Sequence, residues 1–200
     1  IVPVRNEADN IRPLLQEILT FAEPRFDCEV LYVDDGSTDQ TADILRACRK
    51  EFPRLRVFTH TQSCGQSAAV HTGLRHATRE WIAVLDGDGQ NDPADLGKLW
   101  DWLQTQSMPA MAIGYRTNRQ DDDSRKSASR WANGLRAKIL KDSCPDSGCG
   151  LKMLSRDLFL QLPRFDHMHR FMPALVLRAG GKVASVPVSH RPRTAGVSKY

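Results

Sequence analysis

Two kinds of apolar segment alternate along residues 1–115, and this alternation is the feature that most restricts the fold. The runs IVPV, CEVLYV, LRVFTH, WIAVL and AMAIGY are short and apolar, as buried strands are. Between them lie segments with apolar residues at helical spacing, such as Ile11, Leu14, Leu15, Ile18 and Leu19. Strands joined by helical crossovers run parallel. The order therefore predicts an α/β fold: a mostly parallel central sheet flanked by helices on both faces.

The pattern is weaker after Tyr115. The sequence predicts a polar loop (RTNRQDDDSRK), a helix near residues 127–140, a turn-rich loop (CPDSGCG), a second helix within FDHMHRFMPALVLRAGG and a late strand (KVASVPVSH). A chain of 200 residues has the size of one domain. We interpret residues 1–200 as a single domain with two halves, 1–115 and 116–200, and with truncated termini.

Charge is divided unevenly along the chain. Residues 1–100 contain 11 basic and 16 acidic side chains, a net charge of −5, and residues 101–200 contain 17 and 8, a net charge of +9. Solvated surfaces alone can produce such a division. The functional interpretation is an acidic half that holds a metal ion and a basic half that meets phosphate or an anionic surface. The sequence has no basic stripe with interleaved aromatics, which argues against a nucleic-acid partner.

The cysteines and the apolar runs indicate the cellular setting. The five cysteines are odd in number and form no CxxC pair, which favours reduced thiols in the cytosol. No apolar run approaches the roughly 20 residues that span a bilayer. The start of the sequence also lacks the long apolar region of a signal peptide. We therefore expect the chain to meet its substrates on the cytosolic side.

Three acidic loops, PVRNE, DDGS and DGDGQ, follow predicted strands. In parallel sheets ligands bind at the carboxyl ends of the strands, so we expect the three loops at one binding edge. In the third loop Asp86 and Asp88 are so close in sequence that their charges repel unless a cation lies between them. Together with Gln90 they offer oxygen ligands suited to Mg²⁺ or Mn²⁺. A solvated turn is the alternative interpretation.

Several other classes of site do not fit this sequence. Counted from Asp86, an EF-hand would need glycine where Asn91 stands and glutamate where Gly97 stands. Cys and His residues are not clustered at the spacing of zinc ligands. The sequence also lacks a P-loop and a GxGxxG fingerprint, which argues against an NTPase and a dinucleotide-dependent oxidoreductase.

Five segments in this order, VPVRNEADN, VLYVDDGSTDQT, GQSAAVHTG, LDGDGQNDP and HRPRTAGVSKY, resemble glycosyltransferase family 2. Within that family they are most similar to polyprenyl-phosphate glycosyltransferases of the dolichol-phosphate mannose synthase type. The resemblance extends over essentially the whole chain. It implies a GT-A fold, with a Rossmann-like nucleotide-sugar-binding half at residues 1–115 and an acceptor-binding half at residues 116–200. It also implies an inverting transfer from a nucleotide-sugar donor.

The resemblance further implies roles for individual residues. The positions that match nucleotide-sugar contacts are Pro3, Arg5, Glu7, Val33, Asp35, Asp86, Gly87, Asp88, Arg116, Arg193 and Lys199. The positions that match metal ligands are Asp88 and Gln90, with Asp86 as a candidate third ligand. Arg130 matches an arginine that faces the acceptor phosphate. The residues that the resemblance marks as catalytic are Asp88, Arg116, Arg130, Arg193 and Lys199.

Two positions depart from the family pattern. Arg5 replaces a tyrosine that is common in mannose synthases, which leaves the identity of the nucleotide base open. Gly87 stands where alanine is usual. The pair of acidic residues that flanks Gly87 is intact, so the metal expectation is unaffected.

The activity that the resemblance implies is transfer of a hexose from GDP-mannose or a UDP-sugar to a dolichyl or undecaprenyl phosphate, with Mg²⁺ or Mn²⁺ as the cofactor. The enzyme would work at the cytoplasmic face of the membrane, bound peripherally or anchored by segments outside these residues. A lipid phosphate is largely ionised at pH 7 and needs no general base. Cationic side chains beside the metal would stabilise the negative charge that develops on the leaving diphosphate.

Two other functions remain open. The acceptor could be a sugar hydroxyl in polysaccharide or lipopolysaccharide synthesis, which would require a general base. Asp146 could be that base, a contact to the donor sugar or a turn residue. The chain could also be a non-catalytic nucleotide-sugar-binding module. His167 and His169 either approach the acceptor or pack in the interior, and residues 171–177 either belong to the core or lean on a membrane.

Overall fold

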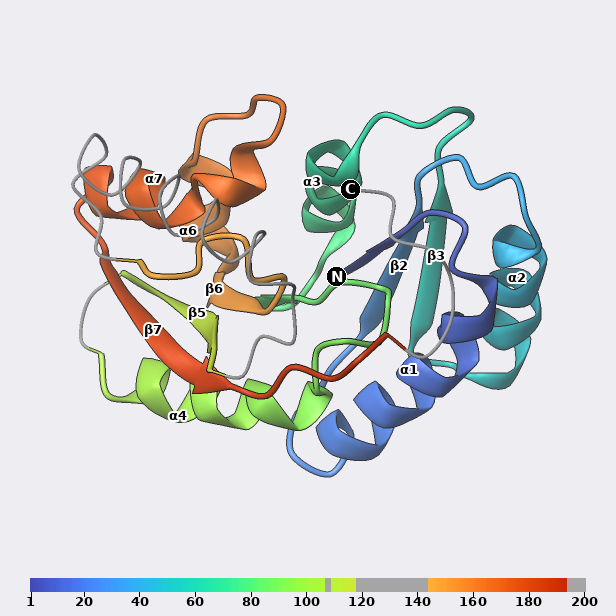
Figure 1. The fold of residues 1–200 in the computed structure, drawn as a ribbon, viewed down its shortest axis with the longest axis horizontal. Helices are drawn as coiled ribbons and strands as arrows, with labels where there is room; N and C mark the ends of the chain where they lie inside the picture. The colour runs from blue at the N-terminus through green and yellow to red at the C-terminus, as the bar shows by residue number, and fades with distance from the viewer. Residues whose placement is uncertain (107–108, 118–143, 194–200) are drawn as a thin grey trace.

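The computed structural model describes residues 1–106, 109–117 and 144–193 (Figure 1). Its strands are β1 (Val2–Val4), β2 (Val30–Asp34), β3 (Leu55–Thr59), β4 (Trp81–Val84), β5 (Ala110–Arg116), β6 (Lys152–Ser155) and β7 (Lys182–Val188). Its helices are α1 (Ala8–Ala22), α2 (Thr41–Glu51), α3 (Gln66–His76), α4 (Leu96–Gln104), α6 (Arg156–Gln161) and α7 (Met172–Arg178), with 3₁₀ turns η1 (Pro93–Asp95) and η2 (Met168–Arg170). The helix predicted near residues 127–140 lies outside the described residues, as do Arg130 and Lys199.

The strands form a mostly parallel sheet. β1, β2 and β3 pair in parallel, and β5 pairs in parallel with β7. β6 is inserted antiparallel between β4 and β5. The two groups of strands meet at Ile1, whose amino group donates to the carbonyl oxygen of Ala83 at 2.7 Å and whose carbonyl accepts from the Leu85 amide at 3.1 Å. The spatial order is therefore β3-β2-β1-β4-β6-β5-β7.

Helices cover both faces of this sheet, as the alternation of segments predicted. Figure 1 shows α1 and α4 on one side and α3 and α7 on the other. The face of α1 that packs on the sheet is the predicted one, with Ile11, Leu14, Leu15, Ile18 and Leu19 all buried. Each such side chain contributes roughly 1.5–3 kcal/mol when it leaves water. The predicted fold class is confirmed.

Two elements of the second half were not predicted. β6 begins at Lys152, a charged residue between Leu151 and Met153, and this charge conceals a strand that is buried at three of its four positions. α6 follows directly, and the Ser155 hydroxyl caps it by accepting from the Leu158 amide at 3.3 Å. Of residues 171–177, all but the first lie in α7, which buries Met172 and Val176 in the core.

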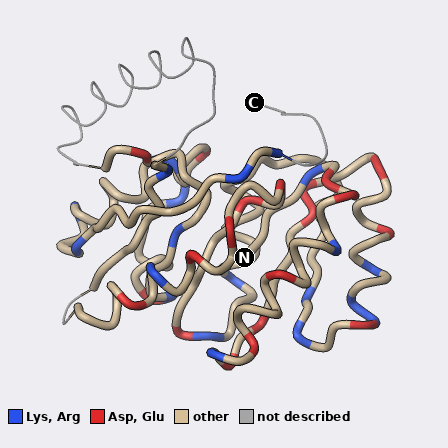
Figure 2. The backbone as a smooth tube through the Cα atoms, turned by 60° about the horizontal axis from the view of Figure 1, so that its bottom comes forward, with Lys and Arg blue, Asp and Glu red and all other residues tan. Residues whose placement is uncertain are grey.

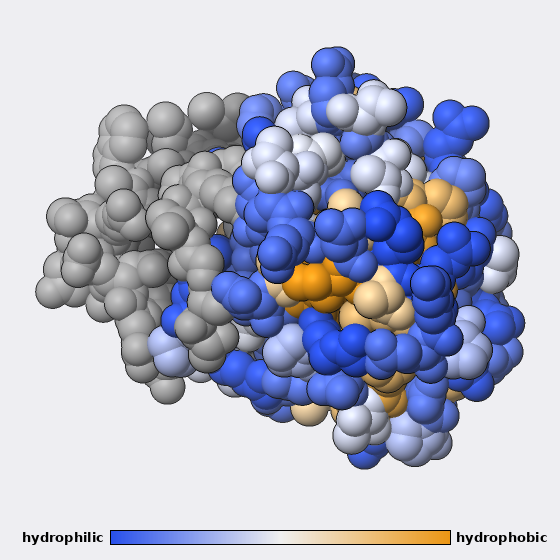
Figure 3. Space-filling view, turned by 90° about the vertical axis from the view of Figure 1, so that its right-hand side faces the viewer, coloured by the Kyte–Doolittle hydropathy of each residue, from blue (hydrophilic) through white to orange (hydrophobic). Residues whose placement is uncertain are grey.

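The described surface carries both signs of charge. Figure 2 shows basic and acidic positions interspersed along the described chain. On the face that Figure 3 shows, hydrophilic residues surround a small hydrophobic patch. Among the described helices, none has the length and apolar character needed to cross a bilayer.

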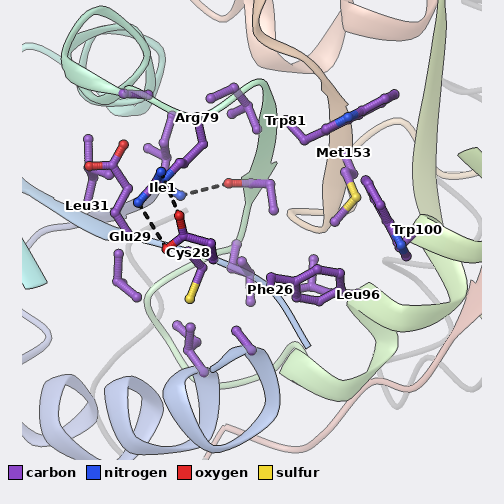
Figure 4. A pocket seen from close by; sticks show the side chains of 18 of the residues that line it. Ile1, Phe26, Cys28, Glu29, Leu31, Arg79, Trp81, Leu96, Trp100 and Met153 are labelled. Carbon is purple, nitrogen blue, oxygen red and sulfur yellow. Dashed lines mark hydrogen bonds and ion pairs between the residues drawn. The ribbon is translucent and has the colours of Figure 1, made fainter. Parts of the chain in front are cut away.

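A cavity of about 430 Å³ borders the starts of β2 and β4 (Figure 4). Its lining is mostly apolar and includes Phe26, Trp81, Leu96, Trp100 and Met153. Ligands of α/β sheets bind at the opposite, carboxyl ends of the strands. We therefore do not assign this cavity to the substrates.

Candidate active site

The loops after β1, β2 and β4 meet at the carboxyl edge of the sheet and enclose a cavity of about 180 Å³, which we call the donor cavity. Its lining residues are Pro3, Val4, Arg5, Glu7, Asp35, Gln66, Asp86, Gly87, Asp88 and Arg193. Most of the predicted nucleotide-sugar residues therefore lie together. Val33 is buried within β2 beneath them. Gln66 is a lining residue that the sequence interpretation did not include.

Hydrogen bonds between the first two loops fix the shape of this edge. The Asn6 amide donates to the Ser37 hydroxyl at 2.8 Å, and the Thr38 amide donates to the Asn6 side-chain oxygen at 2.7 Å. The Glu7 amide donates to the Thr41 hydroxyl at 2.9 Å. Asn6 has a φ of 52°, a left-handed conformation that asparagine tolerates better than most residues. These contacts hold the Glu7 backbone at the edge of the cavity.

Asp35 holds the wall of the donor cavity in place. Its two oxygens lie 2.8–2.9 Å from the amides of Cys64 and Gly65, the Ser63 hydroxyl and a ring nitrogen of His60. Burial acts to raise the pKa of Asp35, but these hydrogen bonds outweigh it and lower the pKa below its usual value. A carboxylate has about four acceptor sites, so protein groups occupy those of Asp35.

Asp35, His60 and Cys64 also lie close enough together to resemble a metal site. The Nδ1 atom of His60 faces Asp35 at 2.8 Å and its Nε2 atom faces the Thr72 hydroxyl at 2.9 Å. Both ring nitrogens therefore have partners already. We interpret this cluster as part of the wall rather than as a metal centre.

Asp35→Asn is expected to lower the free energy of unfolding by about 1–3 kcal/mol at pH 7, because an amide leaves buried donors without acceptors. The folded pKa of Asp35 lies below the unfolded value of about 3.9. Its stabilisation is therefore present above that unfolded value and is lost as the pH falls through the folded pKa. Urea unfolding of both proteins at pH 7 and near pH 3 should show the difference shrinking in acid. An equal difference at both pH values would contradict this role.

Asp86 and Asp88 sit in different surroundings. Asp86 accepts from the Gln66 side chain at 2.7 Å and is partly buried between the two cavities that it lines. Burial raises the pKa of Asp86 and the charge of Asp88 raises it further, against lowering effects from Lys152, Arg116 and the Gln66 hydrogen bond. A divalent cation beside both carboxylates would relieve the burial and the repulsion together. The oxygen donors at this edge therefore fit Mg²⁺ or Mn²⁺.

Two predicted residues lie elsewhere than expected. Gln90 does not line the donor cavity: its side-chain amide donates to the Arg191 carbonyl at 3.3 Å. Arg116 does not line it either, because its guanidinium binds both oxygens of Asp146, at 2.6 and 2.8 Å, with both side chains largely buried. Burial acts to lower the pKa of Arg116, but Asp146 outweighs it and raises the pKa, so the pair stays charged.

The segment after β7 passes over the donor cavity. Arg193 donates to Asp88 at 2.8 Å and to Glu7 at 3.3 Å, so it reaches the predicted metal ligand. Arg191 points away, pairing with Glu17 at 2.6 Å and Asp92 at 2.7 Å. The Arg191 pairs anchor the segment and leave Arg193 at the cavity.

A second cavity, of about 140 Å³, adjoins the first, and we call it the basic cavity. Its lining residues are Gln66, Val70, Val84, Asp86, Gly148, Gly150, Lys152, His169, Arg170 and Met172. Gln66 and Asp86 belong to both cavities. Lys152 was missed by the sequence interpretation; the one available signal was a lysine inside an apolar run.

Comparison with known families gives a consistent picture. Residues 1–162 match the model of glycosyl transferase family 2. The chain is 32% identical over 205 residues to dodecaprenyl-phosphate galacturonate synthase from Rhizobium johnstonii, covering 100% of this chain and 60% of that protein. It is 30% identical over 203 residues to undecaprenyl-phosphate 4-deoxy-4-formamido-L-arabinose transferase from Edwardsiella ictaluri, covering 100% and 62%. The chain thus spans about three fifths of the length of these relatives.

Solved structures with the same fold include glucosyl-3-phosphoglycerate synthase from Mycobacterium tuberculosis, in complex with Mn²⁺, UDP-glucose and phosphoglyceric acid. That likeness has a TM-score of 0.70 at 20% identity and covers 96% of this chain and 70% of the other. A mannosyltransferase from Pyrobaculum calidifontis, in complex with GDP-mannose and Mn²⁺, gives a TM-score of 0.72 at 22% identity, covering 97% and 56%. These likenesses confirm the GT-A fold.

Proposed function

The chain belongs to glycosyltransferase family 2, and on that premise we propose that it transfers a sugar from a nucleotide sugar to a polyprenyl phosphate. The observation that carries the proposal is the donor cavity, where Asp86 and Asp88 meet Arg193 at the carboxyl edge of the sheet. Both relatives named above act on polyprenyl phosphates, by their names. We propose GDP-mannose or a UDP-sugar as the donor, with dolichyl or undecaprenyl phosphate as the acceptor.

The proposed reaction follows from the charges around the cavity. The bond between the anomeric carbon and the diphosphate oxygen breaks, and its electron pair leaves with the nucleoside diphosphate. A metal ion held by Asp88, with Gln90 and Asp86 as further candidate ligands, would supply positive charge against the diphosphate. Arg193 and Lys199 would add cationic contacts where negative charge grows. An acceptor phosphate oxygen attacks the opposite face of the sugar, which gives inversion.

A phosphate acceptor also suits the described carboxylates. A hydroxyl acceptor would need a general base. The candidate for that base, Asp146, has both oxygens bound by Arg116, which favours the ionised form and weakens it as a proton acceptor. A phosphate nucleophile carries its negative charge already and needs positioning rather than deprotonation. In this proposal Arg130 supplies part of that positioning, and the reaction takes place at the cytoplasmic face of the membrane.

An assay of each nucleotide-sugar donor with each acceptor tests the proposal. GDP-mannose, UDP-glucose and UDP-galacturonate would each be incubated with Mn²⁺ and with undecaprenyl phosphate, undecaprenol or a soluble sugar. We expect a glycosyl-lipid monophosphate from one donor, and only with undecaprenyl phosphate. Transfer to the soluble sugar alone would favour the hydroxyl-acceptor enzyme. Nucleotide-sugar binding without turnover under any condition would favour the non-catalytic module.

Arg193→Ala is expected to lower the turnover number by about 10- to 100-fold, with a smaller change in the KM for the donor. A charge-assisted hydrogen bond contributes roughly 1.5–3 kcal/mol, and the diphosphate charge that Arg193 meets is largest in the transition state. Steady-state kinetics would measure both constants. Arg191→Ala is the matched control, since that arginine pairs with Glu17 and Asp92 instead. Equal losses of turnover number in the two variants would show that the path of the segment after β7 matters, and not the charge of Arg193.

A further inference from the structure

The basic cavity adjoins the donor cavity but is lined by a different set of charged side chains. The donor cavity contains Asp88 and Arg193, the groups proposed to face the diphosphate, and the basic cavity contains neither. Asp86 and Gln66 form the shared wall. A group in the basic cavity would therefore lie next to a donor whose diphosphate faces Asp88 and Arg193.

Lys152 is the buried cation of this cavity. It is 3% exposed and extends from β6, where it is paired in register with Val84. Its ammonium donates to the Cys149 carbonyl. Within residues 1–106, 109–117 and 144–193 no carboxylate forms an ion pair with it, although an ammonium buried this deeply is costly unless paired. Burial lowers the pKa of Lys152, and Cys149, Asp86 and Asp146 act to raise it. An anion entering the cavity would compensate for that burial.

His169 offers a second, neutral donor. The Ser67 hydroxyl accepts from the His169 amide at 3.4 Å and lies 2.7 Å from the Nδ1 atom of the ring. In the tautomer in which the hydroxyl donates to Nδ1, the ring proton is on Nε2. Burial lowers the pKa of His169 to about 3, and the charges of Lys152 and Arg170 act in the same direction. The ring is therefore neutral at pH 7, and in that tautomer its Nε2–H does not bind Ser67. Arg170 is exposed and borders the same cavity.

We propose that the basic cavity is the subsite for the phosphate monoester of the acceptor, with Lys152 as its buried cation and His169 and Arg170 as further donors. This inference rests on the proposed function. The three groups present an ammonium, an imidazole N–H and a guanidinium to one space, a set that matches a multiply charged oxyanion. Inversion requires the attacking oxygen to reach the anomeric carbon opposite the leaving diphosphate, and the basic cavity adjoins the donor cavity at Asp86 and Gln66. The acceptor oxygen donates the electron pair of the new bond to the anomeric carbon, and Lys152 keeps its proton throughout.

A carboxylate on the transferred sugar is the rival source of an anion here. It would belong to the donor, whereas the phosphate belongs to the acceptor. The two sources predict different losses when the charge of Lys152 is removed, so one variant measured against both substrates separates them.

Lys152→Met keeps the length of the side chain and removes the charge, and it is the central test. We expect kcat/KM for undecaprenyl phosphate to fall about 100-fold, while the Kd of the nucleotide sugar with Mn²⁺ changes less than twofold. Lys50→Met, on the exposed side of α2, is the matched control and should behave as the wild type. Should Lys152→Met not fold, Arg170→Ala at an exposed position provides the same comparison, with an expected fall of about tenfold.

A binding measurement separates the subsite from the proposed activity. Farnesyl phosphate, farnesol and inorganic phosphate would be titrated into the wild type and Lys152→Met while the imidazole resonances of His169 are followed by NMR. We expect the two phosphates, but not farnesol, to shift the wild-type resonance, and neither to shift it in the variant. If the protein bound the two phosphates in this way but transferred no sugar, the subsite would be supported and the proposed function would be contradicted.

Other outcomes overturn the inference. Normal transfer to undecaprenyl phosphate by Lys152→Met, with an unchanged KM, would remove the phosphate from this cavity. Selective loss of binding to UDP-galacturonate, with acceptor kinetics intact, would assign the cavity to a sugar carboxylate instead. A His169 resonance that does not respond to farnesyl phosphate would also contradict the assignment.

Discussion

Asp88→Ala is expected to reduce sugar transfer by about a thousandfold while the protein stays folded. Asp88 lines the donor cavity and is partly exposed, so its oxygens are accessible to a metal ion and to the diphosphate. Its loss removes a negative charge that raises the pKa of Asp86, which lessens a repulsion in the folded state. Nucleotide-sugar turnover with Mn²⁺ and polyprenyl phosphate measures the first effect, and thermal unfolding without metal measures the second.

The control for this variant is Asp101→Ala on α4, an exposed carboxylate outside both cavities. It should leave turnover unchanged. Mn²⁺ binding in the presence of the nucleotide, followed by electron paramagnetic resonance, should weaken in Asp88→Ala and not in Asp101→Ala. If the Asp88→Ala protein kept a near-normal rate in the presence of a chelator, the metal role proposed for this edge would be wrong.

The sequence was most informative where local pattern determines structure. Alternating apolar segments predicted the strands and helices of residues 1–115, because each buries one apolar face against the sheet. β6 was missed because it begins with Lys152, and a strand of four residues offers little periodicity to outweigh one charge. The adjacency of β1 and β4 was also not predicted, since the hydrogen bonds of Ile1 join residues 82 positions apart.

Site residues differ in the same way in how far local pattern determines their position. Residues that directly follow parallel strands, such as Asp86 and Asp88, could be placed at one edge from topology alone. Side chains with several possible partners could not be placed in this way. Arg116 pairs with Asp146, 30 positions away, and the acceptor sites of Asp35 are occupied by a loop that begins 25 positions later. Sequence spacing carries no information about such competition between contacts.

Gly150→Ala is the substitution from which we expect the largest effect outside the charged residues. A Cβ atom at this position would come closer than 3.0 Å to three carboxyl atoms of Asp86. Asp86 accepts a hydrogen bond from Gln66 at 2.7 Å, so it cannot move aside without loss of that contact. We expect a loss of about 1–3 kcal/mol in the free energy of unfolding, as for other overpacked cores. Because the displaced carboxylate forms the shared wall of both cavities, turnover should fall by about 100-fold or more.

A double-mutant cycle tests whether Gly150 acts through Asp86. If the whole cost is the overlap with that carboxylate, Gly150→Ala should cost almost nothing in an Asp86→Ala background, since the atoms it strikes are gone. Urea unfolding of the four proteins gives the coupling energy, and Mn²⁺-dependent nucleotide binding of the single variants shows whether the metal edge is disturbed. Gly148→Ala is the stability control, because its Cβ would meet its nearest atoms at an ordinary 3.9 Å. Additive stability losses would mean that Gly150 is required by the backbone path of the loop and not by the close approach of Asp86.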